Sequence, residues 1–300
     1  MAEISLVRNV SSRRVTRKAS EAAEKPQPTE SSPIGMFDSG VGGLTVLEKV
    51  TRLLPKESVI YLADTARVPY GGRSNSEIIK INKEILDYFM GLGVKLVIIA
   101  CGTSSAIAYP LLKDKYKVPM ISMIEGGAKL AAAATNNRKI GVIATVGTIN
   151  SLAYQKAIKA LNKEAEVFGV ACPLLVPLIE GGFADSDETE KVLKEYLKPL
   201  RAAKIDTLVL GCTHYPHLTK MIKGILGPGI TIIDPAEEAV RTAKDILAKT
   251  RTANIGNAPP EHRFLVTGPV SSFKEIGSRL LGRPITHAEE ISIVKSPGER

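Results

Sequence analysis

The chain of 300 residues has no tryptophan, 5% aromatic residues and only three cysteines. So few cysteines, odd in number and spread along the chain, exclude a disulfide scaffold and predict a reducing compartment, the cytoplasm. The net charge of +9 could indicate nucleic acid as a partner. Aromatic residues are scarce, however, and the basic residues are spread along the chain without forming a patch interleaved with aromatic ones, which argues against nucleic-acid binding. No apolar run approaches the roughly 18 residues of a membrane span. We therefore expect neither nucleic acid nor membrane as a partner.

Apolar residues make up 44% of the chain, with 25 glycines and 18 prolines, as is usual for a globular α/β protein. Short runs of β-branched and apolar residues alternate with helical patterns such as 75–91 and 188–203. This alternation predicts parallel sheets covered by helices on both faces. The expected strands cover 34–37, 59–63, 95–100, 120–122, 140–144, 165–171, 207–210, 231–233 and 263–266.

The chain contains an internal repeat. Residues 34–43 and 140–149 both read as a short strand that begins Ile-Gly and enters a turn rich in Gly, Ser or Thr, followed by a helical pattern at 44–54 or 151–161. A cysteine then follows at similar distances, Cys101 67 residues after Ile34 and Cys212 72 residues after Ile140. The repeat predicts two α/β units related by a pseudo-twofold axis, with an active site in the cleft between them.

The domain organisation follows from this repeat. Residues 1–33 are rich in Ser, Arg, Glu and Pro and have little apolar periodicity, so we expect a disordered or loosely attached tail. We expect residues 34–124 and 234–300 to form the first α/β domain, because the last strand and helix return to it. Residues 125–233 would form the second domain.

Each of the two cysteines ends a strand. Cys101 follows K-L-V-I-I-A and Cys212 follows D-T-L-V-L-G, which places both at the carboxyl edge where α/β sheets bind ligands. A single cysteine there could be a nucleophile or a small buried residue. Two at equivalent positions of a repeat predict opposed acid/base groups, which is what inverting a stereocentre by proton transfer needs. At helix starts, both thiols are expected to have a lowered pKa.

Five segments resemble the glutamate racemases of the cofactor-independent aspartate/glutamate racemase superfamily: F-D-S-G-V-G-G-L-T-V at 37–46, Y-L-A-D-T-A-R-V-P-Y-G at 61–71, the Cys101 segment, V-P-L-I-E-G-G at 176–182 and G-C-T-H-Y-P at 211–216. The resemblance implies racemisation of glutamate without a cofactor, by a soluble homodimer that supplies D-glutamate for peptidoglycan. It implies that Cys212 takes the proton from the L isomer and Cys101 from the D isomer. It also implies that Asp38 assists Cys101, and that Glu180 and His214 assist Cys212.

By the same resemblance, the substrate-binding residues are Asp38, Ser39, Tyr70, Gly71, Gly102, Thr103, Thr213 and His214, with Thr145 and Thr148 at the equivalent turn of the second unit. Several of these are open to a structural interpretation: Asp38 and the Ser and Thr residues could be ordinary helix caps, and Glu180 a solvated charge. The Cys-x-His-x-x-His spacing at 212–217 lacks the second ligand pair of a zinc site, so we predict no metal. Cys172 has no counterpart in the repeat, and we expect it in the core.

One position departs from the family pattern. The first cysteine motif usually reads Cys-Asn-Thr, and here it reads Cys101-Gly102-Thr103. If the missing amide leaves a substrate contact unmade, restoring it with Gly102→Asn should raise kcat/KM, unless Gly102 has a positive φ. The departure keeps two alternatives open: a racemase for aspartate or another amino acid, and an amino-acid-binding or regulatory protein with weakened catalysis.

Overall fold

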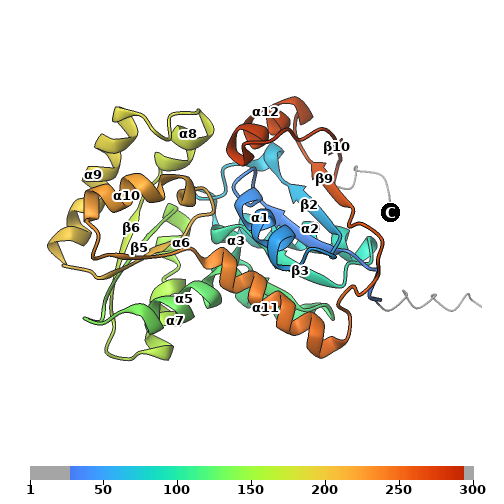
Figure 1. Ribbon diagram of the computed structural model, residues 1–300, viewed down its shortest axis with the longest axis horizontal. Coiled ribbons are helices and arrows are strands. Elements are labelled where there is room, and N and C mark those ends of the chain that lie inside the picture. Colours follow the sequence, from blue (N-terminus) through green and yellow to red (C-terminus); the bar gives the residue numbers. More distant parts are fainter. Residues whose placement is uncertain (1–27, 294–300) are drawn as a thin grey trace, which may run out of the picture.

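The computed structural model describes residues 28–293, which form two parallel β-sheets flanked by helices (Figure 1). Every pair of neighbouring strands in these sheets is parallel. The predicted α/β fold with two units is confirmed. The first sheet has the order β10-β9-β2-β1-β3-β4, from β10 (Glu289–Glu290), β9 (His262–Val266), β2 (Val59–Ala63), β1 (Ile34–Asp38), β3 (Leu96–Ile99) and β4 (Met120–Ser122). The second has the order β6-β5-β7-β8, from β6 (Glu166–Ala171), β5 (Lys139–Ala144), β7 (Thr207–Leu210) and β8 (Thr231–Ile233).

Helices connect the strands in both units. Those before β5 are α1 (Leu44–Leu53), α2 (Asn75–Gly91), α3 (Gly102–Ile107), α4 (Tyr109–Leu112) and α5 (Met123–Ala134). Those after β5 are α6 (Val146–Asn150), α7 (Ala153–Leu161), α8 (Leu175–Glu180), α9 (Asp187–Ala202), α10 (Thr219–Leu226), α11 (Pro235–Thr250) and α12 (Val270–Leu281). Single 3₁₀ turns cover Thr65–Arg67, Lys113–Lys115 and Tyr215–Leu218. Within residues 28–293, no helix has the length and apolar character needed to cross a membrane.

The internal repeat is present in the topology. The order β2-β1-β3-β4 in the first sheet has the same pattern as β6-β5-β7-β8 in the second. The starts of the strands also correspond, since Ile34 pairs with Leu96 and Ile140 pairs with Thr207. Cys101 follows β3 and Cys212 follows β7, which occupy equivalent places. Each unit therefore delivers one thiol from the same position of its sheet.

The first sheet is covered on both faces, and its central strands are apolar throughout for that reason. Successive residues of β3 alternate between two buried clusters: Val97 and Ile99 pack with helix α2 on one face, whereas Leu96 and Ile98 pack with α1 and α11 on the other. Helix α2 begins with a capping box in which Ser74 and Glu77 satisfy each other's backbone N–H groups. These layers fix the carboxyl edge of the sheet, where Asp38 and Cys101 lie.

The predicted boundaries are modified at three places. Residues 1–27 of the predicted tail lie outside the described residues, but 28–33 are attached to the first sheet: Lys95 Nζ donates to the Glu30 carbonyl at 2.6 Å. The predicted boundary at 124–125 divides α5, a single helix that packs against both α11 and α7. The helix predicted over 151–161 begins only at residue 153, because Leu152 has a positive φ of 59° that separates it from α6.

Candidate active site

A cavity of about 430 Å³ is lined by both units. The first unit contributes the end of β1, the loop 68–72 and the start of α3, and the second contributes the turns after β5, β6 and β7 and part of α8. Of the thirteen residues predicted from the sequence, twelve line this cavity: Asp38, Ser39, Tyr70, Gly71, Cys101, Gly102, Thr103, Thr145, Glu180, Cys212, Thr213 and His214. Thr148 is buried and is not among the lining residues.

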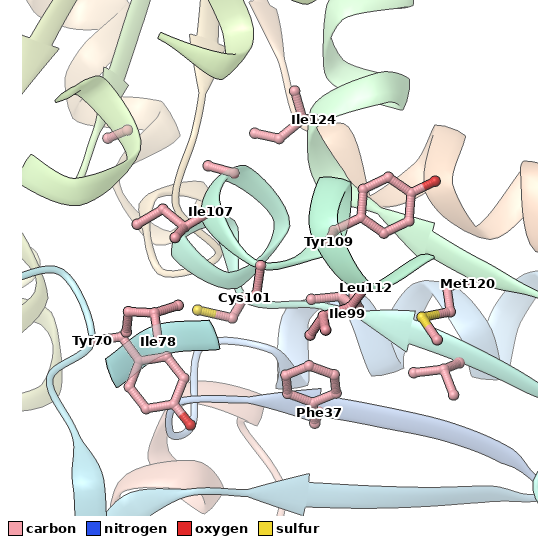
Figure 2. Close-up of a cluster of buried hydrophobic side chains, with 14 of the residues drawn as sticks. Phe37, Tyr70, Ile78, Ile99, Cys101, Ile107, Tyr109, Leu112, Met120 and Ile124 are labelled. Carbon is pink, nitrogen blue, oxygen red and sulfur yellow. The ribbon is translucent and has the colours of Figure 1, made fainter. Parts of the chain in front are cut away.

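Cys101 is the N-cap residue of α3, just after β3, and lies within a buried cluster that includes Phe37, Tyr70 and Ile99 (Figure 2). Burial in this apolar environment, followed by the nearby carboxylate of Asp38, raises the pKa of the Cys101 thiol to about 12. The expectation of a lowered pKa is wrong for this residue. The start of a six-residue helix does not outweigh desolvation and a like charge. Cys101 is therefore a thiol at neutral pH.

Asp38 is buried at the end of β1, where one carboxylate oxygen, Oδ2, accepts two backbone hydrogen bonds. Gly40 N donates at 3.1 Å and Gly43 N at 3.2 Å, so the side chain holds the glycine-rich turn before α1. The helix-capping role considered from the sequence is absent, because α1 begins after Gly43 without a side-chain cap; Asp38 instead binds N–H groups of the turn and lines the cavity. Asp38 therefore both holds the turn in place and faces the cavity.

Three side chains of the second unit form a chain of contacts at the opposite wall. Cys212 Sγ lies 3.7 Å from His214 Nδ1, and His214 Nε2 lies 2.8 Å from Glu180 Oε1. Burial acts to lower the pKa of His214, but its hydrogen bonds to Cys212 and Glu180 outweigh burial and raise it to about 10. His214 is therefore an imidazolium at neutral pH. It places a positive charge beside the Cys212 sulfur.

Cys212 does not sit at the start of an α-helix as the sequence predicted. A turn follows it, and the next element is the 3₁₀ helix Tyr215–Leu218. Local positive charge comes instead from His214, which is held by Glu180 at the end of α8. The two thiols thus have different electrostatic environments, an apolar one with a carboxylate for Cys101 and an imidazolium for Cys212.

Tyr70 and the threonines line the cavity with groups already engaged in the protein. The Tyr70 hydroxyl donates to the buried carboxylate of Asp64, which also accepts from Arg67 Nε at 2.7 Å. Thr103 Oγ1 and Thr145 Oγ1 are 2.9 Å apart and join the two units. Thr145 is also the N-cap of α6, with Thr148 N donating to its hydroxyl at 3.4 Å. Thr148 therefore lies outside the cavity lining but holds the Thr145 hydroxyl in place through these contacts.

The Asp/Glu/Hydantoin racemase model matches residues 34–243. The chain belongs to this family. The resemblance to glutamate racemases is also confirmed: the enzyme of Desulforudis audaxviator is 42% identical, with 87% of this chain and 98% of the relative covered, and that of Bacillus cereus is 40% identical, covering 87% and 97%. A glutamate racemase isoform from Bacillus anthracis superposes with a TM-score of 0.84 at 41% identity, covering 88% and 98%. The Francisella tularensis glutamate racemase, solved with D-glutamate, gives 0.83 at 38%, with the same coverage.

The place where this racemase-family chain departs from the Cys-Asn-Thr pattern is crowded. A Cβ on Gly102 would lie 2.3 Å from the Gly211 carbonyl oxygen, and the φ angle of Gly102 is not positive. The prediction that Gly102→Asn raises kcat/KM needs space for the Asn side chain, and this contact leaves none. The alternative of a backbone conformation that only glycine tolerates is wrong, since the constraint is a contact with the second unit.

The sequence did not point to the apolar wall of the cavity or to Gly42. The wall is formed by Val68, Pro69, Val146, Pro173, Val176 and Pro177 together with Cys172, which also packs in the core as predicted. Such residues carry no chemical signal in a sequence. Gly211 also lines the cavity and could have been predicted as a site residue, because it directly precedes Cys212.

Within 28–293, no group of three or more His, Cys, Asp and Glu residues is placed to hold a metal ion.

Gly42 brings the glycine-rich turn of the first unit against the imidazole of the second. A Cβ here would lie 2.4 Å from both Cε1 and Nδ1 of His214 and 2.6 Å from Thr213 Oγ1. Close by, Thr45 Oγ1 donates to the Thr213 carbonyl at 3.0 Å. The absence of a side chain at position 42 therefore lets the His214 ring occupy its place beside Cys212.

We expect Gly42→Ala to lower kcat by about 10²-fold, because a displacement of about 1 Å at a reacting group has an effect of this size. The methyl group would push His214 Nδ1 away from Cys212, whereas binding of the substrate through other groups would persist. Steady-state kinetics should therefore show a change in kcat larger than the change in KM. A variant with wild-type kcat would show that the position of the His214 ring does not matter.

Proposed function

We propose that this chain is a glutamate racemase that interconverts L- and D-glutamate by moving the α-proton between Cys101 and Cys212. The observation that carries the proposal is that each unit contributes one thiol, from equivalent strands, to the same cavity. The relatives at about 40% identity bear the name glutamate racemase. An aspartate racemase homologue from Pyrococcus horikoshii is 19% identical and supports the fold alone, so the aspartate alternative is not favoured.

In the L-to-D direction, Cys212 is the base. The imidazolium of His214, held by Glu180, stabilises a negative sulfur beside it. The Cys212 thiolate removes the α-proton of L-glutamate, and the electron pair of the broken C–H bond remains on the substrate as a carbanion. Cys101, a thiol at neutral pH because its pKa is about 12, donates its proton to the opposite face. The product is D-glutamate, with Cys212 as thiol and Cys101 as thiolate.

The D-to-L direction needs Cys101 as thiolate, although its pKa in the free protein is high. One cause of the high pKa is the carboxylate of Asp38. The substrate's α-ammonium group placed against Asp38 would neutralise this charge and make the Cys101 thiolate more accessible. Asp38 is thereby suited to couple substrate binding to activation of the first thiol, as well as to hold the turn before α1.

The substrate carboxylates would be bound by hydroxyl and backbone N–H groups that line the cavity, in charge-assisted hydrogen bonds. The candidates are Ser39, Gly71, Gly102, Thr103, Thr145 and Thr213, with the ring of Tyr70 completing the wall. Supply of D-glutamate for peptidoglycan is the role that such an activity would serve in a bacterial cell. The homodimer and the cytoplasmic location stay predictions from the sequence.

Loss of optical activity tests the proposal directly. Purified protein without added cofactor should convert L-glutamate to an equal mixture of both isomers, and D-glutamate to the same mixture, while L-aspartate is turned over far more slowly. A preference for aspartate would indicate the alternative racemase. No turnover of any amino acid, with binding of glutamate retained, would indicate the non-enzymatic alternative.

A further inference from the structure

Gly102 and Gly211, each next in sequence to one of the two cysteines, bring the two units into close backbone contact. Gly102 follows Cys101, Gly211 precedes Cys212, and the Gly102 α-carbon faces the Gly211 carbonyl so closely that a Cβ would lie 2.3 Å from the oxygen. Non-bonded heavy atoms prefer separations of about 3.5 Å or more. The contact therefore exists only because residue 102 has no side chain.

The Gly211 backbone cannot move aside within its own unit. Its N–H donates to the Ile143 carbonyl at 2.8 Å, as a continuation of the pairing between β5 and β7. A Cβ at Gly211 would itself lie 2.9 Å from both Ala144 Cβ and the Ile143 carbonyl oxygen. Because this residue is packed tightly against β5, we expect a side chain at position 102 to separate the two units.

Other contacts also join the two units, and two of them involve a residue close in sequence to one of the two cysteines. The Gly147 N–H donates to the Gly71 carbonyl at 2.9 Å, and the Thr103–Thr145 and Thr45–Thr213 hydrogen bonds also cross between the units. Gly71 has no room for a side chain either, since its Cβ would lie 2.8 Å from Thr145 Cβ. Among these contacts, that of Gly102 with Gly211 joins the two residues that are next in sequence to the two cysteines.

We propose that Gly102 is a positioning residue that sets the separation of Cys101 and Cys212 by letting the second unit's backbone take the space a side chain would fill. The inference rests on the proposed racemase function. The usual Cys-Asn-Thr pattern has a side chain at position 102, whereas in this chain the Gly211 carbonyl lies against the Gly102 α-carbon. A single methyl group would move the units apart by about 1 Å at this point. The two sulfur atoms would then not reach opposite faces of one α-carbon together.

We expect Gly102→Ala to lower kcat for racemisation by about 10²-fold, the effect of a misplacement of about 1 Å. Gly102→Asn should lower kcat at least as much, although it restores the residue usual in the family. The matched control is Gly224→Ala on α10, where a Cβ meets nothing within 4 Å. This control should keep the wild-type rate.

Isotope exchange distinguishes this positioning role from general damage. In deuterated water, Cys212 of Gly102→Ala can still break the α-C–H bond of L-glutamate, exchange the proton on its sulfur for deuterium, and return the deuterium to the same face. The ratio of α-deuterated L-glutamate to D-glutamate, measured early in the reaction, should rise at least about tenfold over wild type, in line with the loss of inversion. A purely structural defect would lower exchange and inversion in proportion.

Three results would overturn the inference: wild-type kcat in Gly102→Ala, an unchanged exchange ratio, or a Gly102→Ala protein that does not fold at all, because the strain should be relieved by separating the units. If the wild-type protein racemises nothing, the proposed function fails instead. In that case the separation of the two thiols is tested with a short bifunctional reagent that can link Cys101 to Cys212, and the fraction of linked protein is measured. Less linkage of Cys101 to Cys212 in Gly102→Ala than in wild type supports the inference, and equal linkage contradicts it.

Discussion

Replacing either Cys101 or Cys212 by alanine is expected to lower the rate of glutamate racemisation by up to about 10⁴-fold, the upper range for loss of an acid/base group. Each thiol serves one face of the α-carbon, so the remaining one cannot both remove and return the proton with inversion. The loss should be equal in the two directions of reaction. Circular dichroism of the amino acid, followed from pure L- and pure D-glutamate, measures both rates.

Cys172→Ala is the matched control for these variants. Cys172 lines the same cavity and is buried, but its sulfur contacts the Val170 carbonyl of its own strand at 3.6 Å and has no acid/base helper comparable to that of Cys212. It should retain most of the activity. All three alanine variants should fold, since each removes one small atom group. Substantial racemisation by Cys101→Ala or Cys212→Ala would contradict a mechanism with two opposed thiols.

Replacing His214 by asparagine is expected to lower kcat at neutral pH by about 10²-fold, the lower range for loss of a group that assists proton transfer. In the wild type, the imidazolium persists up to its pKa of about 10 and places a positive charge beside the Cys212 sulfur throughout the neutral range. Asparagine keeps a polar side chain at this position but carries no charge, so the developing negative charge on the sulfur loses its neighbouring cation. Steady-state kinetics of the variant and the wild type at neutral pH measure the loss.

The contact between His214 and Cys212 also predicts that the activity of the wild type falls at alkaline pH. The charged form of His214 is present below pH 10 and is lost as the pH rises through about 10, so the activity that depends on it falls there. His217→Asn is the matched control, because His217 lies three residues further along and is not a lining residue of the cavity. It should leave the fall in activity at alkaline pH in place. An unchanged kcat in His214→Asn at neutral pH would show that His214 does not assist Cys212.

Much of the fold and of the site could be predicted because both depend on local sequence. Strands buried on two faces read as continuous apolar runs, and β1, β2, β3 and β7 were found for that reason. The repeat then placed Cys101 and Cys212 at equivalent sheet edges without any knowledge of packing. The strand β10 consists of two residues, both exposed, and has no sequence pattern that could have predicted it.

What was missed depends on contacts between distant residues. That Gly42 packs on His214, or Gly102 on Gly211, follows from the orientation of the two units, which no local pattern contains. The pKa of Cys101 was predicted with the wrong sign because a helix start is visible in the sequence, whereas the degree of burial and the position of Asp38 are not. The attachment of residues 28–33 likewise depends on Lys95, which is distant in sequence.

The most direct test of the central claim, one thiol for each face, is solvent exchange in the two single-cysteine variants. Cys101→Ala, which keeps Cys212, should incorporate deuterium from the solvent at the α-carbon of L-glutamate and not of D-glutamate. Cys212→Ala should do so for D-glutamate and not for L-glutamate. Mass spectrometry after separation of the isomers gives both values. Exchange of both isomers by one variant, or of the opposite isomer by each, would contradict the assignment of Cys212 to the L face and Cys101 to the D face.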